Sequence, residues 1–173
     1  MSSSYLLRLL CIISLPVFLL QCYDSLPSQS NGRYSTYEPI LTDRTTLDKV
    51  FFATQSKIVN AGKVYVYNKY VLINEIDKGF HIIDNSNPST PKSIGFLSVL
   101  ASHDAVVKNG ILYCDNATDL ISINFSDITK PTVIGRIQNV FPEQTPPDGL
   151  PLDPEYTPKN SPSNTVIISW RKL

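Results

Sequence analysis

The sequence lacks a net charge, because its 173 residues contain 15 basic and 15 acidic side chains. A large excess of one sign would steer a protein toward nucleic acid or an anionic membrane surface, so the composition predicts no nucleic-acid partner. Cysteine is also scarce: there are three, and Cys11 lies within an apolar N-terminal run. The two remaining cysteines cannot form the several bridges of a disulfide-stapled secreted domain.

Methionine and tryptophan occur once each, whereas the chain has nine tyrosines, seven phenylalanines and 13 prolines. Aromatic and β-branched residues favour strands, and prolines favour turns and stiff loops. The composition therefore predicts an all-β protein.

The N-terminal residues have the pattern of an export signal. Residues 1–22 carry one positive charge, Arg8, before an apolar run that is too short to span a bilayer comfortably. The run ends in Leu19-Leu20-Gln21-Cys22, which resembles the lipobox of bacterial lipoproteins except at Gln21, where that motif has Gly, Ala or Ser. We interpret residues 1–22 as a lipoprotein-type signal peptide with lipid attachment at Cys22. The alternatives are a plain secretory signal cut nearby and an uncleaved anchor.

The next segment reads as a linker followed by a short helix. Residues 23–41 are interpreted as a flexible tether. Residues 23–37 are rich in Ser, Gly, Asn and Pro, and their apolar residues follow no helical or strand period. Residues 42–52 suit one amphipathic helix with Thr42 or Asp43 as its N-cap. The apolar face of that helix would comprise Leu47, Val50 and Phe51.

An internal repeat organises the rest of the chain, because residues 62–97 recur as residues 102–137. At an offset of 40 residues the identical pairs include Ile83 and Ile123, Ser86 and Ser126, Pro91 and Pro131, and Ile94 and Ile134. A repeat of about 40 residues that consists of short strands and turns is typical of a four-stranded propeller blade. The sequence thus predicts two propeller-like blades over residues 42–141, an incomplete β-propeller with one short N-terminal helix.

Each repeat begins with a predicted hairpin. The two-residue turns are Asn68-Lys69 in the first repeat and Asn109-Gly110 in the second, so the offset within the hairpins is 41 residues. It becomes 40 in the later strands, because the first repeat has one more residue between its hairpin and residue 80. Asn-Gly favours a type I′ turn, which needs positive φ at both positions. The later strands of the repeats are expected at residues 80–84, 93–97, 120–124 and 133–137.

Several motifs resemble the LVIVD-repeat family of exported bacterial lipoproteins, which are predicted β-propellers named for the strand that corresponds here to residues 80–84. The motifs are Gly62-Lys-Val-Tyr, Asn74-Glu75, Lys78-Gly79, the run HIIDNSNP at residues 81–88, and Asn139-Val-Phe-Pro142. The resemblance extends from about residue 37 to the end and implies a short member of the family or an N-terminal fragment. It brings no catalytic residues with it. Asn124 departs from the aspartate that ends the family motif.

Residues 142–173 are interpreted as a proline-rich loop followed by a terminal strand at residues 165–170. Seven prolines lie between residues 141 and 162, which excludes regular strands there.

No catalytic or metal-binding constellation stands out, and no cofactor is predicted. His103 and Asp104 begin the second repeat and are the candidate binding residues, with Asp115 and Asp119 as further members of a polar pocket or cation site. The alternative is that these carboxylates cap β-turns. The other candidate residues are interpreted as structural. Glu75 and Asp77 have no catalytic group predicted opposite them. His81 lies in a predicted strand, and Cys114 has apolar neighbours in the sequence.

The sequence therefore predicts a lipid-anchored protein of the cell envelope, at the outer membrane or in the periplasm, that binds or scaffolds and is not an enzyme. Its partners would be the membrane, through the lipid, and a protein or glycan ligand. One alternative is a non-functional or partner-completed fragment of a longer propeller, and another is a propeller-type glycan-active hydrolase. Open strand edges also predict self-association, because unpaired backbone groups invite pairing.

Overall fold

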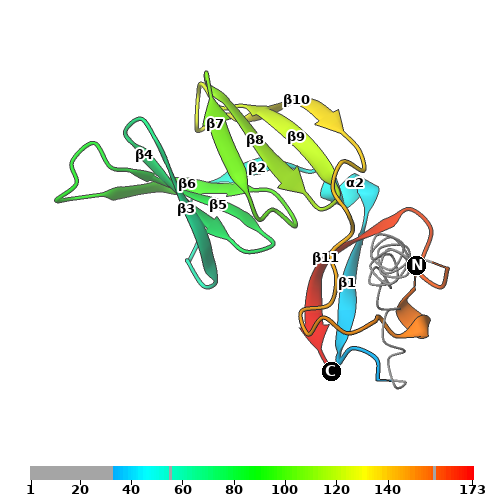
Figure 1. The fold of residues 1–173 in the computed structure, drawn as a ribbon. Helices are drawn as coiled ribbons and strands as arrows, with labels where there is room; N and C mark the ends of the chain where they lie inside the picture. The colour runs from blue at the N-terminus through cyan, green and yellow to red at the C-terminus, as the bar shows by residue number, and fades with distance from the viewer. Residues whose placement is uncertain (1–32, 55, 158) are drawn as a thin grey trace, which may run out of the picture. The chain divides into compact units, whose positions relative to one another are not determined.

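The computed structural model describes residues 33–54, 56–157 and 159–173 (Figure 1). The predicted signal peptide, Cys22 and the first part of the tether therefore lie outside the described residues. The described residues contain no helix that is long and apolar enough to cross a membrane.

The described unit is all-β, as predicted, and consists of three antiparallel sheets. We call the five-stranded sheet, in the order β2-β6-β5-β4-β3, the first sheet. The second sheet has the order β10-β9-β8-β7, and β1 pairs with β11 in a third. The strands are β1 Tyr37–Asp43, β2 Phe51–Ala53, β3 Ala61–Tyr67, β4 Tyr70–Glu75, β5 Gly79–Asp84, β6 Lys92–Ser98, β7 Ala105–Lys108, β8 Ile111–Asn116, β9 Asp119–Asn124, β10 Thr132–Ile137 and β11 Thr165–Lys172. One helical turn, α2 (Arg44–Leu47), and one 3-10 turn (Pro154–Tyr156) complete them.

The two sequence repeats form equivalent four-stranded meanders, β3 to β6 and β7 to β10. Each carries a β-bulge at the same place: the register shifts between Ile82 and Ile83 opposite β6, and between Val133 and Gly135 in β10. The skipped residues are therefore Ile94 and Ile134, which the repeat aligns. A shared bulge bends both outer strands alike, so the repeat is structural as well as sequential.

The predicted Asn-Gly hairpin is confirmed. Asn109 and Gly110 have φ angles of 51° and 76°, which a type I′ turn requires, and they connect β7 to β8. In the first repeat Asn68 also has a positive φ, of 52°.

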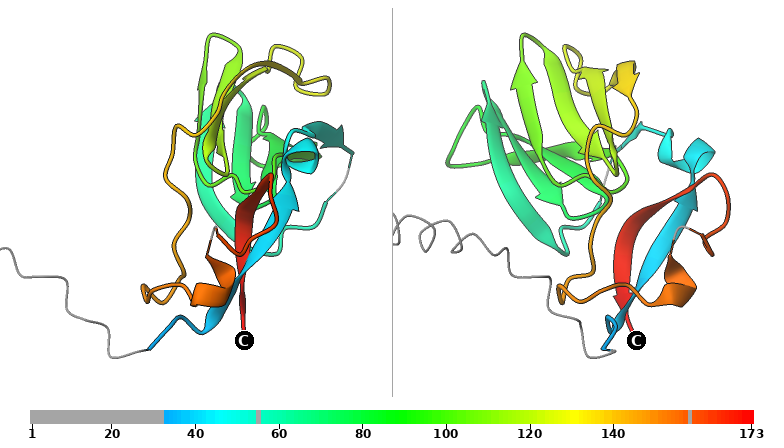
Figure 2. Two further views of the ribbon diagram at one scale, coloured as in Figure 1. Left: turned by 90° about the vertical axis from the view of Figure 1, so that its right-hand side faces the viewer. Right: turned by 45° about the vertical axis from the view of Figure 1, so that its right-hand side comes forward.

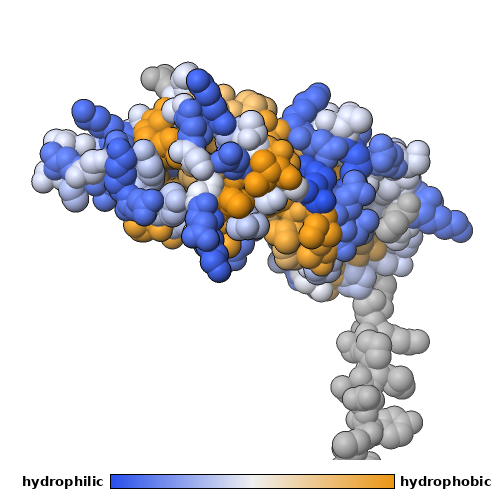
Figure 3. All heavy atoms as spheres, turned by 90° about the horizontal axis from the view of Figure 1, so that it is seen from above, coloured by the Kyte–Doolittle hydropathy of each residue, from blue (hydrophilic) through white to orange (hydrophobic). Residues whose placement is uncertain are grey.

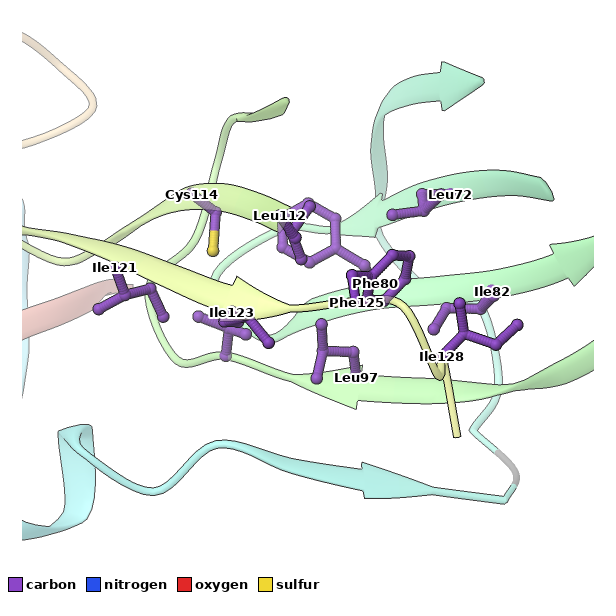
Figure 4. Packing of buried hydrophobic residues seen from close by; sticks show 11 residues of the cluster. Leu72, Phe80, Ile82, Leu97, Leu112, Cys114, Ile121, Ile123, Phe125 and Ile128 are labelled. Carbon is purple, nitrogen blue, oxygen red and sulfur yellow. The ribbon is translucent and has the colours of Figure 1, made fainter. Parts of the chain in front are cut away.

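Each sheet has two faces, which we name by their contacts. Residues paired on neighbouring antiparallel strands share a face. Face A of the first sheet carries Leu72, Phe80, Ile82 and Leu97, and face B of the second sheet carries Leu112, Cys114, Ile121 and Ile123. All eight are buried and pack together in one core (Figure 4). Burying each aliphatic or aromatic side chain stabilises the fold by about 1.5–3 kcal/mol.

The third sheet pairs the two ends of the described unit. β1 and β11 run antiparallel from Tyr37 opposite Lys172 to Asp43 opposite Thr165, and both further views show them side by side (Figure 2). Val166 of β11 packs with Leu47, Ala101 and Ala117 in a second small core. The terminal strand and α2 thus cover one end of the repeats.

Three details differ from the sequence prediction. The helix covers only four residues, although Asp43 is its N-cap as expected and accepts from the backbone N–H of Thr46. Phe51 lies in β2, which pairs with β6 and extends the first sheet to five strands. The last residues of the predicted tether, from Tyr37 on, belong to β1. In each case a pairing partner distant in sequence decides the structure, which local spacing does not reveal.

Candidate binding site

Face A of the second sheet has no sheet packed against it within the described residues. Its paired residues are Val106 with Tyr113, and Leu120 with Ile137. The repeat makes Tyr113, Leu120 and Ile137 the equivalents of Leu72, Phe80 and Leu97, which are fully buried in face A of the first sheet. By contrast, Ile137 is 61% exposed and Val106 is 59% exposed. The chain therefore exposes on its second sheet the face that it buries on its first.

A cavity of about 510 Å³ lies against this face. Its walls combine strand residues of the second sheet with the start of the proline-rich loop. The lining includes His103, Asp104, Val106, Tyr113, Leu120 and Phe141. The Nε2 of Gln144, a further lining residue, is buried without a hydrogen-bond partner. The cavity is mainly apolar, with charged groups at one side.

His103 is the charged centre of that side. Its Nε2 lies 2.7 Å from Oδ1 of Asp77, and its Nδ1 lies 2.9 Å from Oδ2 of Asp115. These hydrogen bonds, first to Asp115 and then to Asp77, raise the pKa of His103 to about 9. The imidazole is therefore a cation at neutral pH and donates through both ring nitrogens. Its positive charge is held between two carboxylates.

Asp115 and Asp77 extend this network. Asp115 also accepts from the backbone N–H groups of His103 and Asp104, at 2.8 Å for the closest contact of each. Asp77 accepts from the hydroxyl of Ser169 in β11 at 2.6 Å. Burial would raise the pKa of Asp77, but the bonds from His103 and Ser169 hold it below its ordinary value. His103 thus ties the second sheet to the first repeat's turn and, through Asp77, to β11.

Asp104, the second predicted residue, joins the two inner strands. Its carboxylate pairs with the ammonium group of Lys63 and accepts from Oη of Tyr65 at 2.8 Å. The hydrogen bonds from Lys63 and Tyr65 lower the pKa of Asp104. Lys63 and Asp104 occupy equivalent positions of the two repeats, so opposite charges meet where the inner strands β3 and β7 come together. His103 and Asp104 line one cavity, and their role in binding stays a prediction.

The structure brings Asp115 into this cluster but places Asp119 elsewhere. Asp119 is fully buried and accepts from Arg44 and Arg136. Burial would raise its pKa, but the bonds from Arg44 and Arg136 hold it below the ordinary value. Within the described residues, no group of three or more His, Cys, Asp or Glu side chains is arranged to hold a metal ion.

The remaining candidates have structural partners. Glu75 accepts from the backbone N–H groups of Val59 and Asn60, and one of its oxygens lies 3.1 Å from Nε2 of His81. Cys114 is buried in the core, and burial raises the pKa of its thiol, which keeps it protonated. Glu75, His81 and Cys114 are therefore parts of the fold.

The apolar walls of the cavity were missed by sequence reasoning, which searched for charged residues. The repeat alignment contained the signal, because the lining residues Tyr113 and Leu120 align with large apolar residues of the first repeat. Within the part of the chain that the structure describes, no sheet packs against face A of the second sheet, so those positions stay uncovered.

Comparison with known protein families supports the interpretation of the repeat. Residues 60–97 match the LVIVD repeat. This span covers β3 to β6 and agrees with the part of the predicted resemblance that lies in the first repeat. Searches of curated proteins and of solved structures gave no significant match. The LVIVD repeat and the stacked meanders together support a repeat protein of the propeller type.

The His103 cluster predicts a specific pH dependence of stability. The folded pKa of His103, about 9, exceeds its ordinary value of 6.5. Its contribution is therefore fully present below pH 6.5 and is lost as the pH rises through 9. Urea unfolding of the full chain should show a midpoint that falls between pH 6.5 and 9, and His103→Gln should flatten that fall. Lys172→Gln, on an exposed site, is the matched control. An unchanged slope in His103→Gln would contradict the prediction.

Proposed function

We propose that this chain is an exported protein, anchored through a lipid on Cys22, whose repeat unit binds another protein at the cell envelope. It belongs by this proposal to the outer membrane or periplasm and acts by binding or scaffolding without catalysis. The observation that carries the binding role is the uncovered face A of the second sheet with its cavity, since an equivalent face is a core surface in the first sheet.

The lining favours a protein ligand over a glycan. Apolar side chains form most of the surface, and protein interfaces centre on such desolvated apolar and aromatic contacts. The charged groups beside it already have partners, because His103 binds two carboxylates and Asp104 binds Lys63. A ligand therefore gains most by placing apolar side chains against Tyr113, Leu120 and Ile137.

The same groups argue for binding and against hydrolysis. A glycan hydrolase uses a pair of carboxyl groups that face the substrate, one as acid and one as base or nucleophile. Asp77 and Asp115 instead flank His103 at hydrogen-bond distance from its two ring nitrogens, and both stabilise its charge. Their arrangement is that of a structural ion cluster.

The lipid anchor rests on the sequence around Cys22 and can be tested directly. Metabolic labelling of the full chain with a radioactive fatty acid in a bacterial host should give a labelled protein in the membrane fraction. Cys22→Ala should lose the label, whereas Cys114→Ala should keep it because that thiol is buried in the core. Label that persists in Cys22→Ala would contradict the anchor.

The binding role is tested by a photo-reactive residue in place of Val106, at the cavity, in the full chain in intact cells. We expect a covalent adduct with a protein that disappears when Ile137→Asp is added. The same probe in place of Leu173, which is exposed and does not line the cavity, is the control. A probe at Val106 that forms no adduct, or one insensitive to Ile137→Asp, would contradict binding at this face.

A further inference from the structure

We propose that the partner bound by face A of the second sheet is face B of the first sheet of a second copy of this chain. The two copies then stack head to tail, with the same pair of faces that already packs within one copy. This inference rests on the proposed binding role and names its partner.

The internal interface provides the template. Within one copy, face A of the first sheet meets face B of the second sheet. The repeat places Tyr113 where Leu72 stands, Leu120 where Phe80 stands and Ile137 where Leu97 stands. Face A of the second sheet is thus built like face A of the first sheet, which packs against a face B. We therefore expect face A of the second sheet to pack against the face B of another copy.

The chain also leaves a face B uncovered, on its first sheet. Val64 pairs with Ile73 and Val66 with Val71, so these four share that face. Val66 is 76% exposed, whereas its equivalent Val107 in the second sheet packs against the core. One end of this face is covered, because the segment before β3 hydrogen-bonds to Glu75. The open part of face B lies at the inner strand β3, where Val64 and Val66 are exposed. Figure 3 shows apolar surface lying among polar surface on one side of the described unit.

Charge complementarity supports the same pairing. Within one copy, Lys63 of the first sheet pairs with Asp104 of the second. In a head-to-tail stack, Asp104 of one copy faces Lys63 of the next, so the charges along the inner strands alternate in sign. The chain has no net charge, so copies do not repel one another. Contact between two like faces would join two first sheets or two second sheets, and so would not set Lys63 of one copy against Asp104 of the other.

Such a contact uses two different surfaces and is therefore heterologous, so it generates a ring if the rotation closes and a filament if it does not. A propeller of four or more blades is a closed ring of sheets, and copies with two sheets each can complete one. This association differs from pairing of strand edges, because the backbone groups of the edges take no part in it.

Complementation between two variants tests the proposal. Full-length chains with two different C-terminal tags are co-expressed, extracted in mild detergent and recovered through one tag. Wild-type copies should co-purify. Ile137→Asp present in both copies, or Val66→Asp present in both, should reduce co-purification at least about tenfold, because each buries an unpaired carboxylate. Leu173→Asp in both copies is the control and should change nothing.

The mixed pair gives the decisive result. A copy with Ile137→Asp keeps its face B, and a copy with Val66→Asp keeps its face A, so this pair should co-purify as a capped dimer. Loss of co-purification in the mixed pair, or its persistence when both copies carry the same substitution, would overturn head-to-tail stacking. If wild-type copies do not co-purify while the Val106 probe captures a different protein, self-association fails and the binding role stands.

Discussion

Replacing Asp119 with alanine should lower the free energy of unfolding by about 3–5 kcal/mol, because it leaves two partly buried guanidinium groups without their carboxylate. Both oxygens of Asp119 lie 2.7 Å from Nη1 of Arg44, and Oδ2 also lies 2.7 Å from Nη1 of Arg136. The backbone N–H of Asn139 donates to it as well. One carboxylate thus joins α2, β9, β10 and the loop that follows β10.

Asp48→Asn is the matched control for this prediction. Asp48 binds the same Arg136 through Nε at 3.2 Å but is half exposed, and exposed ion pairs contribute only about 0–1 kcal/mol. Chemical unfolding followed by circular dichroism measures both variants. A loss in Asp119→Ala no larger than that in Asp48→Asn would contradict the central role of the buried carboxylate.

Gly79→Ala should be comparably damaging, with a loss of about 2–5 kcal/mol from backbone strain and overpacking together. Gly79 has φ of 138°, and a Cβ there would lie 2.0 Å from the carbonyl oxygen of Leu97 and 2.9 Å from the N–H nitrogen of Val99. Both contacts are with backbone, so neither can be relieved by rotating a side chain. β5 would have to separate from β6 at the point where face A is packed.

Gly149→Ala isolates the conformational part of this cost. Gly149 also has a positive φ, of 68°, but a Cβ there meets nothing within 4 Å. Its substitution should cost about 1 kcal/mol, the penalty for a left-handed non-glycine residue. Thermal melting of both variants compares their losses of stability, and the excess loss in Gly79→Ala measures the steric clash. Equal losses would contradict the prediction, because they would mean that the structure around Gly79 accommodates the added Cβ.

The strands of the repeats could be predicted from the sequence because their signals are local. Alternating apolar residues, the Asn109-Gly110 turn and the offset of 40 residues each specify structure within one repeat. The observed β5 and β9 each begin one residue before the predicted strands, at Gly79 and Asp119.

The contacts that complete the unit could not be predicted in this way. The partner of β1 lies more than 100 residues away in β11, and Arg44 reaches Asp119 across 75 positions. Nothing within residues 23–41 distinguishes a strand from a linker when the partner strand is unknown. The candidate site could be predicted only in part. His103 and Asp104 stand out in the sequence as charged residues at the start of the second repeat. The apolar wall could not be predicted, because it depends on which face of a sheet remains uncovered in the fold.

The pairing of β1 with β11 has a mechanical consequence. β1 ends at Asp43, which is also the N-cap of α2. The next residue, Arg44, donates hydrogen bonds to the carboxylate of Asp119. Tension that reaches the described unit from its N-terminal side is carried along β1 to Arg44 before it can act on β3 to β10. The hydrogen bonds between β1 and β11 therefore bear this tension first, and the ion cluster at Asp119 bears it only after they have separated.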